Sequence, residues 1–309
     1  MSLGLCCQYI EPVKKRTGNV VYKNIIEEKT LQLGAFKAGK YPLSRIRSTY
    51  HHNVDQHIKL VPKLVSLNIR SFRLSSCLLP LWDQNSQMIK DDAVLVGKLA
   101  TLGKLFIDNG IRVTTHPGQF TVISSDNTNV IKNSITELEY HAWVFDAMGL
   151  PLSSYAAINI HGGKANRSAT VVTVYRSLPD NVRSRLTLEN DERCYNVSQL
   201  MDIHDRCGVP IVFDSHHYTF NTGDMSFTQA FDDTLSTWGN IKPLQHISNT
   251  EPGFENAPFN QKRAHSQYIH RIPDQQLEAI RLNTIDVDVE AKHKNLALLD
   301  MRKKFLISC

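Results

Sequence analysis

The sequence has little of several features that mark specialised classes of protein. No apolar run approaches the roughly 18 residues of a membrane-spanning helix. The N-terminal residues lack the basic region and long apolar stretch of a signal peptide. We therefore expect a cytoplasmic protein with no membrane partner. Neither charge dominates, because 35 Lys and Arg residues stand against 30 Asp and Glu residues. The net charge of +5 excludes a histone-like protein and permits a polyanionic partner without requiring one.

Cysteine is also sparse, with six residues in 309 and no C-x-x-C pair. Neither a disulfide framework nor a Cys₄ zinc site is therefore expected. No linker rich in Pro, Gly or Ser and no internal repeat interrupts the chain, so we expect one domain over residues 1–309. The apolar fraction of 41% is sufficient for a large core. The unusual number is 13 His, and only their positions can show what they do.

Short β-rich runs alternate with helix-like segments along most of the chain. Parallel strands need crossover connections, so this alternation predicts a parallel sheet. Eight such units predict an α/β protein built as a single (β/α)₈ TIM barrel. The expected strands are Leu3–Cys7, Ile69–Ser75, Ile111–His116, Ala156–His161, Arg185–Glu189, Pro210–Asp214, Leu244–Ile247 and Ile285–Glu290. The expected helices are Asp55–Asn68, Asp91–Asn109, Asn127–Met148 and the segment from Asn196 to Cys207.

The chain is longer than the roughly 250 residues of a typical barrel, and we place the extra length in a long first crossover, residues 8–52. This crossover is polar and basic, with Lys14, Lys15 and Arg16 in one run. A basic segment can follow a nucleic-acid backbone, or it can simply be a solvated surface. Both interpretations stay open here.

Metal-binding side chains recur at the predicted strand ends. In a TIM barrel the active site lies where the strands end, and six of the eight expected strands carry His, Asp or Glu at the last residue or, in Leu244–Ile247, one residue before it. The strand-end residues are His116, His161, Glu189, Asp214, His246 and Glu290, and His217 and His265 follow in loops. One such residue can be purely structural, but eight at one mouth would repel and desolvate one another without a cation. The pattern therefore predicts a metal site.

The ligand types narrow the choice of metal. Imidazole and carboxylate without thiolate suit Mn²⁺, Zn²⁺, Fe²⁺ or Co²⁺ better than Ca²⁺ or Mg²⁺. Eight candidates exceed the needs of one ion, so we expect two or three divalent ions that share bridging carboxylates, with Glu189 and Glu290 as the candidates for sharing. Such centres usually serve displacement at phosphorus.

Nine stretches in order along the chain resemble the UV damage endonucleases, relatives of endonuclease IV among the xylose-isomerase-like barrels. They are Leu3–Cys6, Phe72–Ser76, Thr115–Phe120, Asn159–Gly163, Leu188–Glu192, Val212–His217, Gln245–Ser248, Arg263–His265 and Val289–Lys292. The resemblance implies metal ligands at the eight residues named above, and Mn²⁺ as the ion. It also implies a nick in duplex DNA on the 5′ side of pyrimidine dimers, (6-4) photoproducts and abasic sites, which leaves a 3′-hydroxyl and a 5′-phosphate.

Three residues are candidates for DNA contact. Gln119 and Phe120 follow the third strand and are placed to probe an opened base stack, because damaged nucleotides are extruded at lower cost than intact ones. Phe120 stands where several family members have Tyr, so the stacking face is kept and the hydroxyl is lost. The alternative for Phe120 is a core anchor. Arg73 is expected to hold a phosphate, with an ion pair inside the barrel as its alternative.

For catalysis we expect Glu189, Glu290, Asp214 and His246 to carry the chemistry, in a chain that acts as a monomer on damaged double-stranded DNA. A lysine that some members carry two residues before the aligned histidine is Leu244 here, so no such role is implied. Two other functions are weighed against this one. One is a metal-dependent sugar isomerase or epimerase on the same barrel, and the other is a metal-stabilised module that binds damaged DNA without cutting it.

Overall fold

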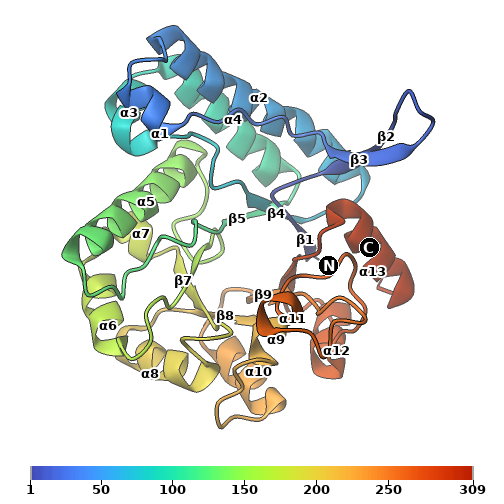
Figure 1. Ribbon diagram of the computed structural model, residues 1–309. Helices are drawn as coiled ribbons and strands as arrows, with labels where there is room; N and C mark the ends of the chain where they lie inside the picture. Colours follow the sequence, from blue (N-terminus) through green and yellow to red (C-terminus); the bar gives the residue numbers. More distant parts are fainter. Residues whose placement is uncertain (1, 308–309) are drawn as a thin grey trace.

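The computed structural model describes residues 2–307 and shows eight parallel strands closed into a barrel (Figure 1). In order around the barrel, each strand pairs with the next along the chain, and the last pairs with the first. The strands are β1 Ser2–Cys6, β4 Ser71–Leu74, β5 Arg112–Thr115, β6 Ile158–His161, β7 Leu186–Glu189, β8 Ile211–Asp214, β9 Leu244–Ile247 and β10 Asp286–Val289. The predicted fold class is confirmed.

Helices surround the barrel, and each long crossover carries at least one of them (Figure 1). They are α1 Leu33–Lys37, α2 Leu43–Ser66, α3 Trp82–Lys90, α4 Ala93–Asp108, α5 Thr128–Ala147, α6 Ser168–Ser177, α7 Asp180–Arg183, α8 Val197–Cys207, α9 Ser215–Tyr218, α10 Phe227–Ser236, α11 Phe259–Lys262, α12 Asp274–Arg281 and α13 Lys294–Lys304. None of the helices in residues 2–307 has the length and apolar character to cross a membrane. The cysteines of this region are all free thiols, and Cys309 lies outside the described residues.

Three predicted helices begin and end close to the expected residues because their ends carry capping signals. Asn127 and Asn196 accept backbone N–H groups at the starts of α5 and α8. Asn196 also forms a capping box with Gln199, and Gly208 ends α8 in the left-handed conformation that glycine favours. Because these capping residues can be recognised in the sequence, the predicted and observed helix ends agree.

The first crossover differs from its prediction. The helix expected from Asp55 is α2, and it begins twelve residues earlier, at Leu43. Its buried stripe starts at Ile46, Tyr50 and Val54, but charged neighbours conceal this spacing in the sequence. An antiparallel hairpin, β2 Ile10–Lys14 and β3 Val20–Asn24, precedes α1 and was not predicted. Its mostly exposed strands lack the apolar alternation on which strand prediction depends.

The interior of the barrel is polar, where most barrels pack branched apolar side chains. Three acids of β10 and its end point inward at successive levels, because side chains two residues apart share a face: Asp286, Asp288 and Glu290. Asp288 accepts hydrogen bonds from the hydroxyls of Ser71 and Thr114. Gly4 leaves room for it, since a Cβ there would lie 2.0 Å from Asp288 Oδ1.

A buried ion pair closes the end of the barrel opposite the mouth. Arg112 is fully buried, and its guanidinium lies 3.0 Å from Asp286 Oδ2. It also donates to the backbone carbonyls of Ser154, Tyr155 and Lys242. The Lys242 ammonium lies 2.7 Å from the other Asp286 oxygen. The pair therefore ties β5 and β10 to two loops across the floor of the barrel.

We expect Arg112→Met to destabilise the protein by about 3–5 kcal/mol, because it leaves a buried carboxylate without its main partner. Urea unfolding followed by circular dichroism measures the loss. Arg206→Met, which removes an exposed arginine from α8, should change stability by less than about 0.5 kcal/mol. Equal losses for the two variants would contradict a special role for Arg112.

Candidate metal centre

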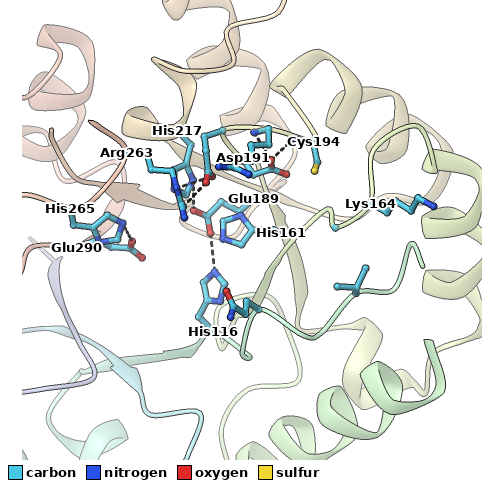
Figure 2. Close-up of a pocket in the computed structure, with 15 residues that line it drawn as sticks. His116, His161, Lys164, Glu189, Asp191, Cys194, His217, Arg263, His265 and Glu290 are labelled. Carbon is cyan, nitrogen blue, oxygen red and sulfur yellow. Dashed lines mark hydrogen bonds and ion pairs between the residues drawn. The ribbon is translucent and has the colours of Figure 1, made fainter. Parts of the chain in front are cut away.

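A cavity of about 590 Å³ opens at the carboxyl ends of the barrel strands (Figure 2). Its floor holds acids and imidazoles from several different strands, and cationic side chains stand at its rim. Figure 2 shows His116, His161 and His217 arranged around Glu189, with His265 and Glu290 to one side. The cavity therefore lies where the strand-end pattern predicted a site.

Three groups of side chains come close enough to hold metal ions, with the ligand atoms of each group within 4.8 Å of one another. Glu189 belongs to two groups, and Asp214 belongs to two. The groups are His116, His161 and Glu189; Glu189, Asp214 and His217; and Asp214, His246 and Glu290. Seven of the eight predicted ligands are thus brought together in a connected chain of groups. The two residues that belong to more than one group are Glu189 and Asp214. Glu290, the other residue expected to be shared between ions, belongs to one group.

Glu189 lies at the centre of this arrangement with 1% of its surface exposed. Its Oε1 is 3.2 Å from Nδ1 of both His217 and His246, and its Oε2 is 3.3 Å from Nε2 of His116. Asn159 donates a short hydrogen bond to the same carboxylate. Burial alone would raise the pKa of Glu189, but the surrounding imidazoles hold the pKa well below its ordinary value. The carboxylate is therefore ionised and available to a cation.

The neighbouring imidazoles respond to these acids. Burial opposes a charge on His217, but Asp214 and Glu189 raise the pKa of His217 to about 11. In the same way Glu189 and Glu290 overcome burial and raise the pKa of His246 to about 9. His161 differs, because burial lowers its pKa. An imidazole must be neutral to bind a metal, so a cation at His217 or His246 takes the place of a proton.

His265 completes the predicted ligand set at the edge of the mouth. Its Nε2 lies 3.2 Å from Glu290 Oε2, and it belongs to none of the three groups formed by the described residues. The other Glu290 oxygen forms an ion pair with Arg73. Arg73 has 8% of its surface exposed, so the structure shows the ion pair inside the barrel. A phosphate contact by Arg73 stays a prediction.

The donor set fits divalent metal ions. Oδ2 of Asp214 and Nδ1 of His161 are buried and have no hydrogen-bond partner among residues 2–307, and both residues belong to the groups. Such atoms are costly unless something binds them. The other oxygen of Asp214 accepts the backbone N–H groups of His216 and His217, so the free oxygen is held in a fixed direction. Nitrogen and oxygen ligands without thiolate suit first-row transition metals.

The two residues expected to probe DNA lie at the mouth. Gln119 lines the cavity, and Phe120 beside it is 83% exposed. Phe120 is thus not the core anchor that was weighed as its alternative. Exposure of a phenyl ring to water is unfavourable, so contact of the Phe120 ring with another apolar or aromatic surface would lower the free energy.

Sequence reasoning missed residues that hold the ligands in place. Asn159 links Glu189 to Thr187, and Asn190 exchanges two hydrogen bonds with the backbone of Asp214. Asp288 lies beneath His246, with 3.9 Å between its Oδ2 and Nε2 of the imidazole. A signal existed for Asp288, since I-D-V-D-V-E places an acid at every second residue. For Asn159 the only signal in the sequence was its position two residues before His161, a predicted ligand.

The sequence matches the UV-endonuclease UvdE family over residues 15–307. The chain belongs to this family. A relative from Nostoc sp., "UV DNA damage endonuclease", is 34% identical over 274 residues, which cover 85% of this chain and 81% of the relative. The protein of that name from Deinococcus radiodurans is 34% identical over 250 residues, with 77% and 78% covered. The resemblance carried by the nine motifs is confirmed.

Solved structures agree with the sequence comparison. The crystal structure of SacUVDE covers all of both chains with a TM-score of 0.80 at 25% identity. A 3-keto-D-glucoside 4-epimerase from E. coli covers 82% of this chain and 94% of its own, with a TM-score of 0.56 at 13% identity. The second likeness shows the fold alone. This chain therefore has the same barrel fold as a sugar epimerase, and its sequence is similar to those of UV DNA damage endonucleases.

We expect Mn²⁺ to stabilise the folded protein, by about 2.7 kcal/mol for one site at a hundredfold excess over its Kd. Asp214→Asn keeps the oxygen that caps α9 and replaces the unpartnered one, so most of this stabilisation should disappear. Asp92→Asn is the matched control, because Asp92 also caps a helix and lies 3.0 Å from a histidine, His51, but outside the mouth. Thermal unfolding with and without Mn²⁺ measures the shift. A full shift in Asp214→Asn would contradict the assignment.

Proposed function

We propose that this chain nicks duplex DNA immediately 5′ to UV lesions and leaves a 3′-hydroxyl and a 5′-phosphate. The proposed lesions are cyclobutane pyrimidine dimers, (6-4) photoproducts and abasic sites. The observation that carries the proposal is the connected chain of three metal-binding groups beneath an exposed aromatic ring, in a member of an endonuclease family. Recognition of DNA alone needs no such centre, which argues against a binding module without catalysis.

We propose two or three divalent ions, with Mn²⁺ as the ion, held by the three groups and by His265. When bound, such ions activate water for attack on phosphorus and stabilise the oxygen that leaves. The residues of this chain fix where that chemistry occurs. Glu189 and Asp214 each belong to two adjacent groups, so they would hold neighbouring ions together when these are bound. His246 and Glu290 position the third group next to Arg73.

Arg73 supports the centre from below. Its ion pair fixes one oxygen of Glu290, and the other oxygen faces His265. Burial would raise the pKa of Glu290, but Arg73, His246 and His265 hold that pKa below its ordinary range. Glu290 therefore stays anionic, and its orientation is set before any substrate arrives. One chain supplies every proposed ligand, so we propose a monomer as the active unit.

The rim of the mouth supplies the proposed test for damage. A lesion weakens stacking and pairing, so its nucleotides are extruded into the cavity at lower cost than intact ones. Phe120 can then fill the space that is left in the stack, with Gln119 beside it toward the cavity. Base identity plays no part in this test, which suits lesions that differ in chemistry and share a distortion.

Glu189→Gln should abolish nicking, by at least about 10³-fold, because the amide removes the charge that connects two groups. Binding of the damaged duplex should remain. Glu137→Gln also replaces a carboxylate beside a histidine, 3.3 Å from His141 Nε2, and should stay active because it lies outside the mouth. The assay is Mn²⁺-dependent cleavage of a labelled duplex with one pyrimidine dimer. Full cleavage by Glu189→Gln would refute its role, and a wild-type protein that binds but never nicks would refute the proposed function.

Phe120→Ala should reduce cleavage of the dimer-containing duplex by about ten- to a hundredfold, since stacking on an aromatic ring is worth about 1–3 kcal/mol per base. Phe120→Tyr keeps the ring and should cleave normally. Phe254→Ala removes another exposed phenylalanine, which is 42% exposed outside the cavity lining, and should have no effect. Gel assays on damaged and abasic duplexes measure all three. Normal cleavage by Phe120→Ala would show that the ring does not take part.

A further inference from the structure

The first crossover carries more than the whole net charge of the protein. Residues 14–47 contain nine Lys and Arg and two Glu, so their net charge is 9 − 2 = +7. The full chain carries +5, which leaves 5 − 7 = −2 for all other residues. The nine cations are Lys14, Lys15, Arg16, Lys23, Lys29, Lys37, Lys40, Arg45 and Arg47. The rest of the molecule is therefore slightly acidic, and the positive charge lies in one segment.

These nine cations are all exposed, and within residues 2–307 none of them forms an ion pair. Some cations elsewhere in the described chain have a carboxylate partner, such as Lys98, 2.7 Å from Asp55, and Arg206, 3.1 Å from Asp202, and others do not; the segment differs in holding nine unpaired cations within 34 residues. Of the two acids in the segment, Glu28 faces His57 and accepts from Ser75. The positive charge of the segment is therefore not neutralised by the protein itself.

Stability does not account for this arrangement. Arg45 and Arg47 lie in the first turns of α2, where the helix dipole disfavours positive charge. Nine like charges in 34 residues also repel one another, and apart from Arg45, which lies 4.6 Å from the Tyr41 ring centroid, the structure offers them little compensation. A polyanion that binds the segment would relieve both costs.

The topology places the segment at the same end of the barrel as the metal-binding groups. β1 ends at Cys6 on the mouth side, and the hairpin follows directly. α2 begins at Leu43 and returns along the outside of the barrel to the start of β4, as a helix in a βα unit must. In the middle of the segment, Glu28 accepts a hydrogen bond from Ser75 just after β4, so the chain around Lys29 lies beside the mouth, and the hairpin lies next to it between α2 and α13.

The hairpin is anchored at its base and free at its tip. Asn295 of α13 exchanges two hydrogen bonds with the backbone of Ile10, and Lys63 of α2 pairs with Glu11. Lys14 pairs with Val20 at the last position of the ladder, and Lys15 and Arg16 continue into the turn. Figure 1 shows the hairpin projecting beyond the ring of helices at the upper right. Its strands of five residues reach about 17 Å.

We propose that the β2–β3 hairpin and the segment that follows it form a cationic arm that binds the phosphate backbone of duplex DNA to one side of the lesion. The arm reads no sequence and no damage. It holds the flanking duplex so that the lesion is presented to the mouth. The choice of DNA as the polyanion rests on the proposed function, and an anionic lipid surface is the competing partner for exposed cations next to Val20 and Tyr22.

The test compares two variants with the same change in charge. The arm variant is Lys14→Ser, Lys15→Ser and Arg16→Ser at the hairpin tip. The control is Lys104→Ser, Arg206→Ser and Lys303→Ser, which removes three exposed cations from the C-terminal halves of α4, α8 and α13, away from the mouth. Affinity for undamaged duplexes of about 12 and about 40 base pairs is measured with Mn²⁺ over a range of salt, one turn of DNA being about 10 base pairs.

We expect the arm variant to bind the long duplex at least about tenfold more weakly at low salt, with the slope of log K against log salt reduced by about 2–3. The short duplex, which offers fewer flanking phosphates, should lose less affinity than the long one, and the control should match the wild type on both. An unchanged slope, or an equal change in the control, would overturn the proposal. So would loss of binding to phosphatidylserine vesicles with normal binding to DNA. Wild-type nicking of a dimer-containing duplex in the same preparation reports separately on the proposed function.

Discussion

The burial of the Glu189 carboxylate is the constraint on which the barrel mouth depends. An ionised acid with 1% of its surface exposed is tolerated only if its oxygens have partners. Here the partners come from β5, β8 and β9 and their ends, through His116, His217 and His246. Each of these imidazoles must be brought to the same point by the closure of the barrel. The closed barrel therefore holds this negative charge at one buried point, where imidazoles take the place of water as its partners.

The three inward acids of β10 show how one strand serves both structure and chemistry. At the floor, Asp286 faces two fixed cations, and nothing further can bind there. In the middle, Asp288 receives only hydroxyl hydrogen bonds, in space left by Gly4. At the mouth, Glu290 has one oxygen beside Arg73 and His246 and turns the other toward His265, and these imidazoles can exchange a proton for a metal. The partners that neutralise these acids thus change along the barrel axis, from fixed cations at the closed end to imidazoles at the mouth whose proton a metal can replace.

The sequence predicted the barrel, and it predicted that the candidate ligands come together, because strand ends are local and their convergence follows from the fold. All eight strands were found, and seven ligands fell into connected groups. The levels inside the barrel were harder to predict, since they depend on the register between neighbouring strands. Gly4 and Asp288 become a pair only when β1 and β10 are in register. The grouping of ligands around Glu189 and Asp214 depends on distances across the barrel, which no spacing along the chain contains.

The separation of charge within the molecule follows from the same constraint. A mouth lined by ionised acids repels DNA, and it does so most strongly where the scissile phosphate must sit. The divalent ions proposed for the mouth would reverse the sign of that field locally. They do not act far from the mouth, because screening limits their reach to about 10 Å at ordinary salt. Long-range attraction must then come from cations elsewhere, at the same end of the barrel and free of internal partners. In the proposal made above, the first crossover supplies this attraction, since it carries +7 while all other residues together carry −2.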